Sequence, residues 1–109
     1  MGLSIIMGNM FSGKTSEMIR RLKRYKVIGK KIIVINSAKD TRSPDEVLKS
    51  HDNVTFECFK TMKLFDLINK TEYDSADIVA IDEAQFFPDL KKFIECSLSI
   101  GKSVVIAGL

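Results

Sequence analysis

Cysteine and long hydrophobic runs are both scarce in this chain of 109 residues. Its two cysteines, Cys58 and Cys96, stand 38 positions apart and form neither a C-x-x-C pair nor a disulfide framework. No hydrophobic run approaches the roughly 20 residues of a membrane-spanning helix, and the N-terminus lacks the basic region and cleavage site of a secretory signal. These absences exclude disulfide-rich secreted proteins and membrane-spanning proteins. We therefore expect a soluble, reduced, cytoplasmic protein with no membrane partner.

The residues that are present indicate one folded domain. Hydrophobic residues make up 45% of the chain and charged residues 28%, with a formal net charge of +3. The hydrophobic content is too high and the net charge too low for a disordered chain. We expect a single domain over residues 1–109 that buries about two-thirds of the surface of the unfolded chain.

Positive charge is concentrated in one segment. Residues 18–39 hold eight basic residues and no acidic one, whereas the rest of the chain has a net charge of −5. The eight are Arg20, Arg21, Lys23, Arg24, Lys26, Lys30, Lys31 and Lys39. Such a block either binds a polyanion or forms the solvated face of a helix.

Strand-like and helix-like segments alternate along the chain. Short apolar runs predict strands over residues 3–7, 32–35, 54–59, 77–81 and 104–107, of which the first, second and fourth are expected to be buried. Apolar residues at helical spacing predict helices over residues 14–29, 64–68 and 88–99. The polar residues 37–53 predict a loop with a turn at residues 43–45. This alternation is typical of an α/β fold in which helices cover both faces of a parallel sheet.

The two longer helices have a clear inward face and a clear end. In the first, Met18, Leu22 and Tyr25 form an apolar stripe that Ile19 and Ile28 widen, and Gly29 is its expected stop. In the last, Leu90, Phe93, Ile94 and Leu98 are expected to point inward, and Gly101 ends the helix.

A phosphate-binding loop is the strongest motif. Residues 8–15 read G-N-M-F-S-G-K-T, which fits the pattern G-x-x-x-x-G-K-[ST] between a predicted strand and a predicted helix. The backbone N–H groups of such a loop bind phosphate oxygens at the positive end of the helix dipole. Lys14 can reach the β- and γ-phosphates, and the Thr15 hydroxyl can ligate Mg²⁺. A glycine-rich turn that fits by accident rarely has both flanking elements in place.

An acid pair follows the strand predicted at residues 77–81. Asp82 and Glu83 stand at the carboxyl end of that strand, which is the end where ligands bind in open α/β sheets. Asp82 is suited to hold Mg²⁺, and Glu83 is suited to accept a proton from water or from a hydroxyl. The residues alone do not show whether water or a substrate hydroxyl would give the proton to Glu83, and a solvated strand end is the plain alternative.

Three strings together resemble the zinc-lasso class of thymidine kinases. They are M-F-S-G-K-T at 10–15, A-K-D-T-R at 38–42 and I-D-E-A-Q-F-F-P-D at 81–89. Their order and separation cover essentially all 109 residues. The resemblance implies a phosphate-loop NTPase-type parallel sheet with a recombinase-like core. It also implies transfer of the γ-phosphoryl of ATP to the 5′-hydroxyl of thymidine or deoxyuridine, with Mg²⁺, in nucleoside salvage.

The resemblance also implies a role for each matching residue. Glu83, as proton acceptor, and Lys14 are the expected catalytic residues, while Thr15 and Asp82 are expected to hold Mg²⁺. The residues expected to bind ATP are Gly8, Asn9, Met10, Phe11, Ser12, Gly13, Lys14, Thr15, Asp40, Thr41, Arg42, Asp82, Glu83, Ala84 and Gln85. Those expected near the nucleoside base are Met10, Phe86 and Leu109. From residue type alone, Met10 and Phe86 would be assigned to core packing.

The chain departs from the family pattern at two points. Asn9 stands where proline is usual, and the sequence stops at Leu109. The family continues with a C-terminal domain that binds a structural zinc and closes a lasso loop over the nucleoside. We therefore expect no zinc site within residues 1–109, and poor thymidine phosphorylation by these residues alone. A homotetramer is implied by the resemblance only.

Two other functions remain open on the sequence. The basic block could belong to an ATPase that acts on DNA, although no aromatic residues interleave for base stacking, so nucleic-acid binding is not expected. Alternatively, the chain could be a nucleotide-binding remnant without catalysis.

Overall fold

The computed structural model describes residues 2–7, 14–37, 47–49 and 55–108. The strands are β1 (Leu3–Met7), β2 (Ile32–Ser37), β3 (Val47–Lys49), β4 (Thr55–Thr61), β5 (Ile78–Ile81) and β6 (Ser103–Gly108). The α-helices are α1 (Lys14–Val27), α2 (Thr71–Ser75) and α3 (Leu90–Ser99). Two 3₁₀ helices, η1 (Leu64–Leu67) and η2 (Ala84–Phe86), complete the described elements.

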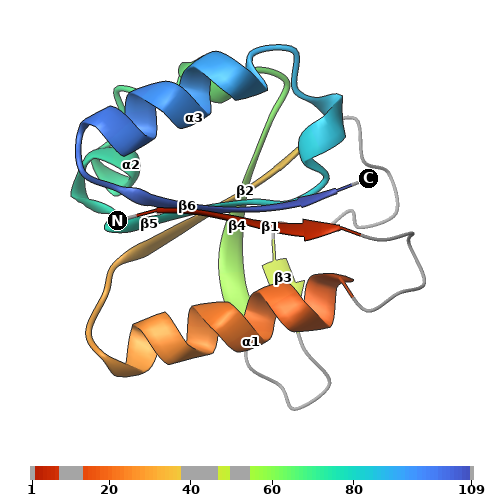
Figure 1. Cartoon of the computed structure of the whole chain (residues 1–109), viewed down its shortest axis with the longest axis vertical. Helices are drawn as coiled ribbons and strands as arrows, with labels where there is room; N and C mark the ends of the chain where they lie inside the picture. The colour runs from red at the N-terminus through yellow and green to blue at the C-terminus, as the bar shows by residue number, and fades with distance from the viewer. Residues whose placement is uncertain (1, 8–13, 38–46, 50–54, 109) are drawn as a thin grey trace.

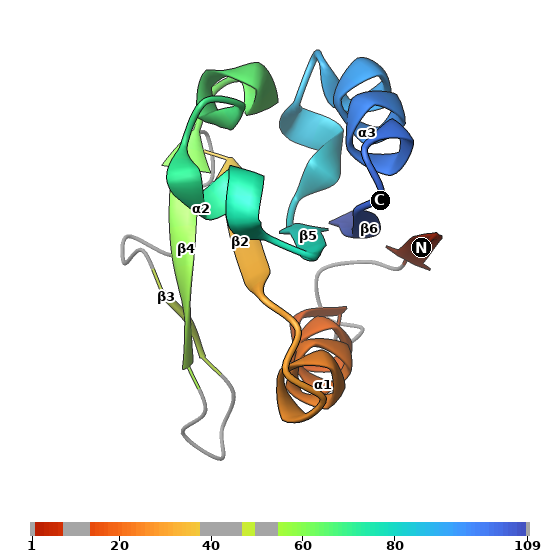
Figure 2. The ribbon, with the colours of Figure 1, turned by 90° about the vertical axis from the view of Figure 1, so that its left-hand side faces the viewer.

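The strands form one sheet in the order β1-β6-β5-β2-β4-β3. All neighbours are parallel except β3, which pairs antiparallel with β4. Helix α1 covers one face, and α2 and α3 cover the other (Figures 1 and 2). The predicted α/β class, the parallel sheet and the helices on both faces are confirmed.

Alternate residues of the central strands face the two helical layers, as the period of a strand requires. Val34, Ala80 and Val105 pack with Met18 and Leu22 of α1. On the other face, a second core contains an aromatic residue of α3 and the strand residues that alternate with those facing α1. Its strand and α3 members are Ile33, Ile35, Val79, Ile81, Val104 and Phe93. Because both faces are covered, the central strands are hydrophobic at nearly every position.

Both predicted helix stops are confirmed. Gly29 and Gly101 have positive φ angles of 82° and 87°. After α1, Gly29 N–H donates to Lys26 O and Lys30 N–H donates to Tyr25 O, at 3.0 and 3.1 Å. This pair of bonds is the Schellman arrangement, and α3 ends in the same way at Gly101. The left-handed conformation explains why glycine stands at both positions.

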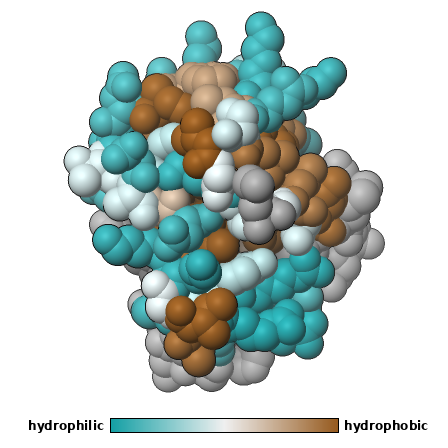
Figure 3. Space-filling view, turned by 60° about the vertical axis from the view of Figure 1, so that its left-hand side comes forward, coloured by the Kyte–Doolittle hydropathy of each residue, from teal (hydrophilic) through white to brown (hydrophobic). Residues whose placement is uncertain are grey.

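Two predictions about exposure are wrong. Ile28 does not widen the apolar stripe of α1, because it lies beyond the helix end and is 66% exposed. Together with Val27 it forms a small apolar patch at this end of the molecule, where Figure 3 shows hydrophobic surface among hydrophilic side chains. The first strand is not buried on both faces either, since Leu3 and Ile5 are 43% and 54% exposed on β1 at the sheet edge.

Three local elements also differ from prediction. Within the predicted loop at 37–53, β3 (Val47–Lys49) is a strand; the expected turn at 43–45 lies outside the described residues. The helix predicted at 64–68 is the 3₁₀ helix η1. Helix α2 was not predicted, because it is short and polar and buries a single side chain, Tyr73.

A buried lysine, Lys102, lies at the amino edge of the sheet, which is the edge where the parallel strands begin. Lys102 is 6% exposed, and its Nζ donates to Asp74 O at 3.0 Å and to Ala76 O at 2.7 Å. The same ammonium lies 4.9 Å from the ring centre of Tyr73. The Tyr73 hydroxyl is within 2.6 Å of Ser97 Oγ, and burial raises the pKa of the phenol despite this hydrogen bond. Lys102 therefore satisfies the carbonyls at the end of α2 in the way that a helix cap does.

Candidate functional site

Five parallel strands end at one edge of the sheet, and the ends of β1 and β6 at this edge lie on the right in Figure 1. We call it the carboxyl edge. Strand β1 ends at Met7 and α1 begins at Lys14, so described elements flank the predicted phosphate loop on both sides. Residues 8–13 lie outside the described residues, as do Asp40, Thr41, Arg42 and Leu109. The strand and the helix that the motif requires are both present.

Asp82 is held at the start of the turn that follows β5. Its backbone N–H donates to Ile35 O of β2 at 2.8 Å, so the residue continues the ladder between the two strands. The carboxylate is buried, with the residue 6% exposed, and Asp82 Oδ1 accepts the Glu83 N–H at 3.0 Å. This side-chain to backbone bond fixes the turn and orients the carboxylate at the carboxyl edge.

Glu83 has a strained backbone. Its φ of 53° and ψ of 46° place it in the left-handed region, the one residue other than glycine with positive φ among those described. It is 7% exposed, and Glu83 Oε2 accepts the amide Nε2 of Gln85 at 2.7 Å. A buried, hydrogen-bonded carboxylate on a residue with left-handed backbone is the kind of strained feature that clusters at functional sites.

Gln85 also touches the end of β6. A Cβ added to Gly108 would lie 2.4 Å from Gln85 Oε1 and 3.3 Å from the backbone nitrogen of Ala84. Gly108 is paired in register with Met7, the last residue of β1 before the predicted phosphate loop. The side chain of Gln85 thus spans from the Glu83 carboxylate to the strand beside β1.

The two phenylalanines of the motif have different environments. Phe87 is 5% exposed and belongs to the core under α3, whereas Phe86 is 37% exposed. An exposed aromatic ring next to the acid pair can contact a ligand, in keeping with the nucleoside contact expected of Phe86. The structure therefore brings together Asp82, Glu83, Ala84, Gln85 and Phe86 on a single turn.

Sequence reasoning missed two polar residues at the same edge. Asn36 and Ser37 end β2, next to β5, and are 5% and 1% exposed. Asn36 Oδ1 accepts the Ser37 N–H at 2.8 Å. The available signal was a buried apolar strand that turns polar at its carboxyl end, the same pattern that revealed Asp82.

Asp82 fits the ligand chemistry of magnesium. Mg²⁺ prefers oxygen ligands and is usually held by one or two carboxylates together with substrate phosphates. Among the described residues there is no group of three or more His, Cys, Asp or Glu that could hold a metal ion by itself. A Mg²⁺ ion that is bound by one carboxylate together with nucleotide phosphates does not require such a group. The side chain of Thr15, the other expected ligand, lies outside the description.

The basic residues of α1 form the solvated face of an amphipathic helix. Arg20 and Arg21 pair with Glu17 along the helix, and the Arg21 hydrogen bond, with help from Arg20, lowers the pKa of the Glu17 carboxyl. The opposite face contributes Met18 and Leu22 to the core. This arrangement accounts for the helical part of the basic block without a nucleic acid.

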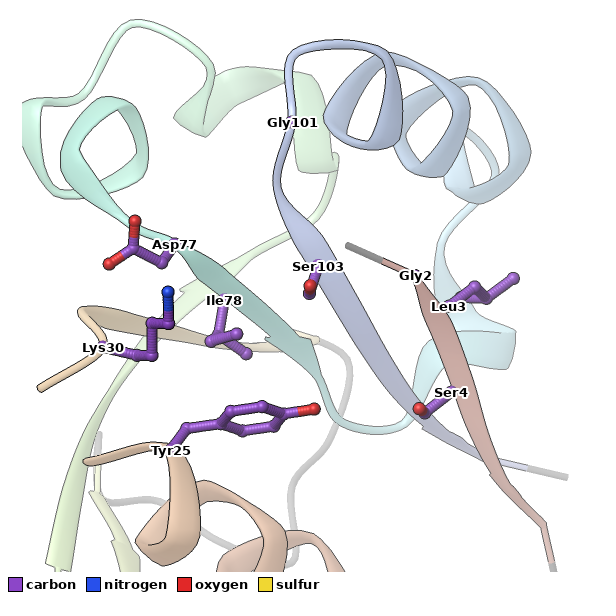
Figure 4. Close-up of a pocket in the computed structure, with 9 residues that line it drawn as sticks. All are labelled: Gly2, Leu3, Ser4, Tyr25, Lys30, Asp77, Ile78, Gly101 and Ser103. Carbon is purple, nitrogen blue, oxygen red and sulfur yellow. The ribbon is translucent and has the colours of Figure 1, made fainter. Parts of the chain in front are cut away.

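A hollow of about 390 Å³ lies at the amino edge, away from the acid pair. Figure 4 shows the Tyr25 ring pointing across it from α1, with Lys30 and Asp77 at its rim. Its lining residues are Gly2, Leu3, Ser4, Tyr25, Lys30, Asp77, Ile78, Gly101 and Ser103. In parallel sheets, ligands bind at the carboxyl ends of the strands, so the turn that carries Asp82 and Glu83, and not this hollow, is the candidate site. Across the described part of the chain, no helix is long and apolar enough to cross a membrane.

Comparison with known proteins identifies the family. A family model described as thymidine kinase matches residues 1–109. The chain is 42% identical to thymidine kinase 1 of Dictyostelium discoideum over 98% of its own length and 48% of the relative's. It is 38% identical to human cytosolic thymidine kinase and 40% identical to the thymidine kinase of raccoon poxvirus, again over 98% of its own length, covering 44% and 59% of those proteins. The chain thus spans about half the length of the curated relatives that it matches. It belongs to the thymidine kinase family.

Proposed function

We propose that the intact protein transfers the γ-phosphoryl of ATP to the 5′-hydroxyl of thymidine or deoxyuridine. With thymidine, the product is dTMP, a precursor for DNA synthesis made by salvage. The observation that carries the proposal is the buried acid pair directly after β5. Only β6 separates β5 from β1, the strand that leads into the phosphate loop of this family member.

The phosphate-binding half of the site is assigned to the start of α1. Backbone N–H groups of residues 8–15 and the ammonium of Lys14 hold the phosphates at the positive end of the helix dipole. The Thr15 hydroxyl and the Asp82 carboxylate would hold Mg²⁺, which would neutralise charge on the nucleotide phosphates. Asp40, Thr41 and Arg42 are assigned to triphosphate binding by the family pattern alone. The orientation of Asp82 by its bond to the Glu83 N–H supports this role.

Glu83 is assigned as the proton acceptor. Its carboxylate takes the proton of the 5′-hydroxyl as the 5′ oxygen bonds to the γ-phosphorus, while the bond from that phosphorus to the departing ADP oxygen breaks. The hydrogen bond from the Gln85 side-chain amide supports the assignment, because it limits the rotation of the Glu83 carboxylate. Met10, Phe86 and Leu109 are assigned to the base, and the 37% exposure of Phe86 supports its part.

The remaining features of the proposal come from the family. We propose that a structural zinc and a loop over the nucleoside are supplied from beyond residues 1–109, since the chain covers about half of its relatives. A homotetramer and a cytoplasmic location complete the proposal; the human relative is named cytosolic.

Transfer of labelled γ-phosphate from ATP to a panel of nucleosides tests the function, with Lys14→Ala as the inactive control. We expect thymidine and deoxyuridine to be labelled by the intact protein and not by the variant. ATP binding without transfer to any nucleoside would favour a non-catalytic nucleotide-binding protein. ATP hydrolysis stimulated by DNA would favour the ATPase, but the pairing of Arg20 and Arg21 with Glu17 disfavours it.

A further inference from the structure

Asp89 stands at the N-cap of α3 but does not cap that helix. Its backbone carbonyl accepts the Phe93 N–H at 3.1 Å, as an N-cap residue should, yet its side chain makes no cap hydrogen bond to α3. Aspartate is among the best N-cap residues because its carboxylate usually accepts a backbone N–H of the first turn. The carboxylate of Asp89 is therefore used elsewhere.

The carboxylate caps η1, which precedes it in the chain. Asp89 Oδ1 accepts the Leu64 N–H at 3.1 Å, and Asp89 Oδ2 accepts the Phe65 N–H at 3.0 Å, across 25 and 24 residues. The N-cap residue of η1 itself, Lys63, makes no side-chain cap hydrogen bond. One carboxylate thus accepts hydrogen bonds from two backbone N–H groups at the start of a helix whose own N-cap side chain makes no cap bond.

The η1 end of this contact is firmly attached to the core. Leu64 and Leu67 are 0% and 4% exposed. The Phe65 ring packs edge-on against Phe93 of α3, with ring centres 5.6 Å apart. Thr61 Oγ1 donates to Lys63 O at 2.9 Å and so secures the connection from β4. Because η1 is fixed, the two hydrogen bonds restrain Asp89.

The acid turn, residues 82–89, is consequently held at both ends. At its start, the Asp82 N–H bonds to Ile35 O at 2.8 Å; at its end, Asp89 bonds to η1. Between these two points Glu83 adopts its left-handed conformation, which persists only where the surrounding structure imposes it.

We propose that Asp89 is a positioning residue for phosphoryl transfer: its carboxylate anchors the acid turn to η1 and thereby fixes Glu83 and Phe86. The catalytic consequence rests on the proposed function. The anchoring itself does not, and it can be measured without any activity.

Asp89→Ser is the informative variant. A serine can cap α3 from the same position, but its short hydroxyl cannot reach both donors of η1. We expect hydrogen exchange at the Leu64 and Phe65 amides to accelerate about tenfold or more, since each loses a bond to a charged acceptor. The Phe86 amide, which donates to Glu83 O at 3.2 Å within the turn, should exchange faster as well. Asp89→Asn keeps one acceptor oxygen and should show a smaller change at all three amides.

Kinetics of the intact protein separate positioning from simple stability. For Asp89→Ser we expect kcat per folded molecule to fall about tenfold to a hundredfold through displacement of the reacting groups, while KM for ATP stays within about twofold. Asp89→Asn should recover part of kcat. Asp66→Ser is the matched control, because it removes an exposed carboxylate from η1 itself and should change neither exchange nor kcat.

Each result decides the proposal. Unchanged exchange at Leu64, Phe65 and Phe86 in Asp89→Ser would overturn it, and so would normal kcat in a variant whose exchange is faster. A loss of activity that disappears when kcat is expressed per folded molecule would indicate general destabilisation and would also overturn it. If the unsubstituted protein phosphorylated no nucleoside, the proposed function would fail, and the three amides would still show whether Asp89 anchors the turn.

Discussion

The two edges of the sheet both bury charge, but they do so in opposite ways. At the amino edge the buried charge is the ammonium of Lys102, which is matched by two backbone carbonyls and an aromatic ring. At the carboxyl edge the buried charges are two consecutive carboxylates, Asp82 and Glu83, and the second stands on strained backbone. The first arrangement stabilises the fold. The second places two buried acids at the end of the sheet where ligands bind, which is the place expected of a functional site.

Removing the basicity of Glu83 should have the largest effect. Glu83→Gln keeps the size and hydrogen-bonding capacity of the side chain but cannot accept the substrate proton. We expect turnover of the intact protein to fall by about 10²- to 10⁴-fold while Mg²⁺–ATP still binds, as measured by kinetics and calorimetry.

Asp82→Asn is the contrasting variant for that prediction. It should raise the Mg²⁺ concentration needed for half-maximal activity, because it weakens a metal ligand and leaves the proton acceptor in place. Full turnover in Glu83→Gln would mean that another group takes the proton.

The phosphate half of the carboxyl edge is tested by Lys14→Ala. Loss of one preorganised charge-stabilising donor should lower turnover by about 10²-fold or more. The melting temperature should change little, since the substitution is at the first residue of α1 and alanine favours helix. Near-normal turnover would reject the phosphate-loop assignment.

At the amino edge, substitution of the buried charge should lower the stability of the fold and leave turnover nearly unchanged. Lys102→Met removes the hydrogen bonds to Asp74 O and Ala76 O and leaves these carbonyls without their donor. We expect the free energy of unfolding to fall by about 2–4 kcal/mol, measured by denaturant titration, with little change in turnover per folded molecule. Lys91→Met, on the exposed side of α3, is the control and should be close to neutral. An equally small effect of both would show that Lys102 is not a structural cap.

The smallest effect on turnover is expected from a substitution at Gly108, where β6 meets the side chain of Gln85. In Gly108→Ala the new methyl group meets the Gln85 carboxamide, whose flexible end can move aside. Its hydrogen bond to Glu83 would then weaken, and turnover should fall a few-fold, the equivalent of about 1 kcal/mol for one hydrogen bond. Gly2→Ala, where the added methyl group would meet nothing within 4 Å, should leave turnover unchanged. A loss of stability without loss of turnover in Gly108→Ala would contradict this role for Gln85.

Residues whose role depends on local pattern were predictable from the sequence. The alternation of apolar runs indicated the parallel sheet, and Gly29 and Gly101 were identified as helix stops because positive φ is a local requirement. The acid pair was recognised because Asp82 and Glu83 interrupt an apolar strand at the end where ligands bind.

Residues whose role depends on distant partners were not predictable. The apolar run of β1 resembles that of a central strand, and only the strand order makes it an edge with Leu3 and Ile5 exposed. Lys102 reads as one more surface lysine, because its partners are backbone carbonyls that leave no mark in the sequence. Asp89 reads as a cap for the helix that follows it, whereas it binds a helix about 25 residues earlier.

The pairing of β1 with β6 has a consequence for synthesis on the ribosome. The register joins Leu3 to Val104 and Met7 to Gly108, so the strand made first pairs with the strand made last among those described. At about 5–20 residues per second, roughly 5–20 seconds pass before β1 has a neighbour. Until then, the segment that leads into the phosphate loop has no sheet to join. On the proposed function, a nascent chain that stops short of β6 is therefore expected to bind no nucleotide, and ATP is expected to stabilise the domain only after translation has passed Gly108.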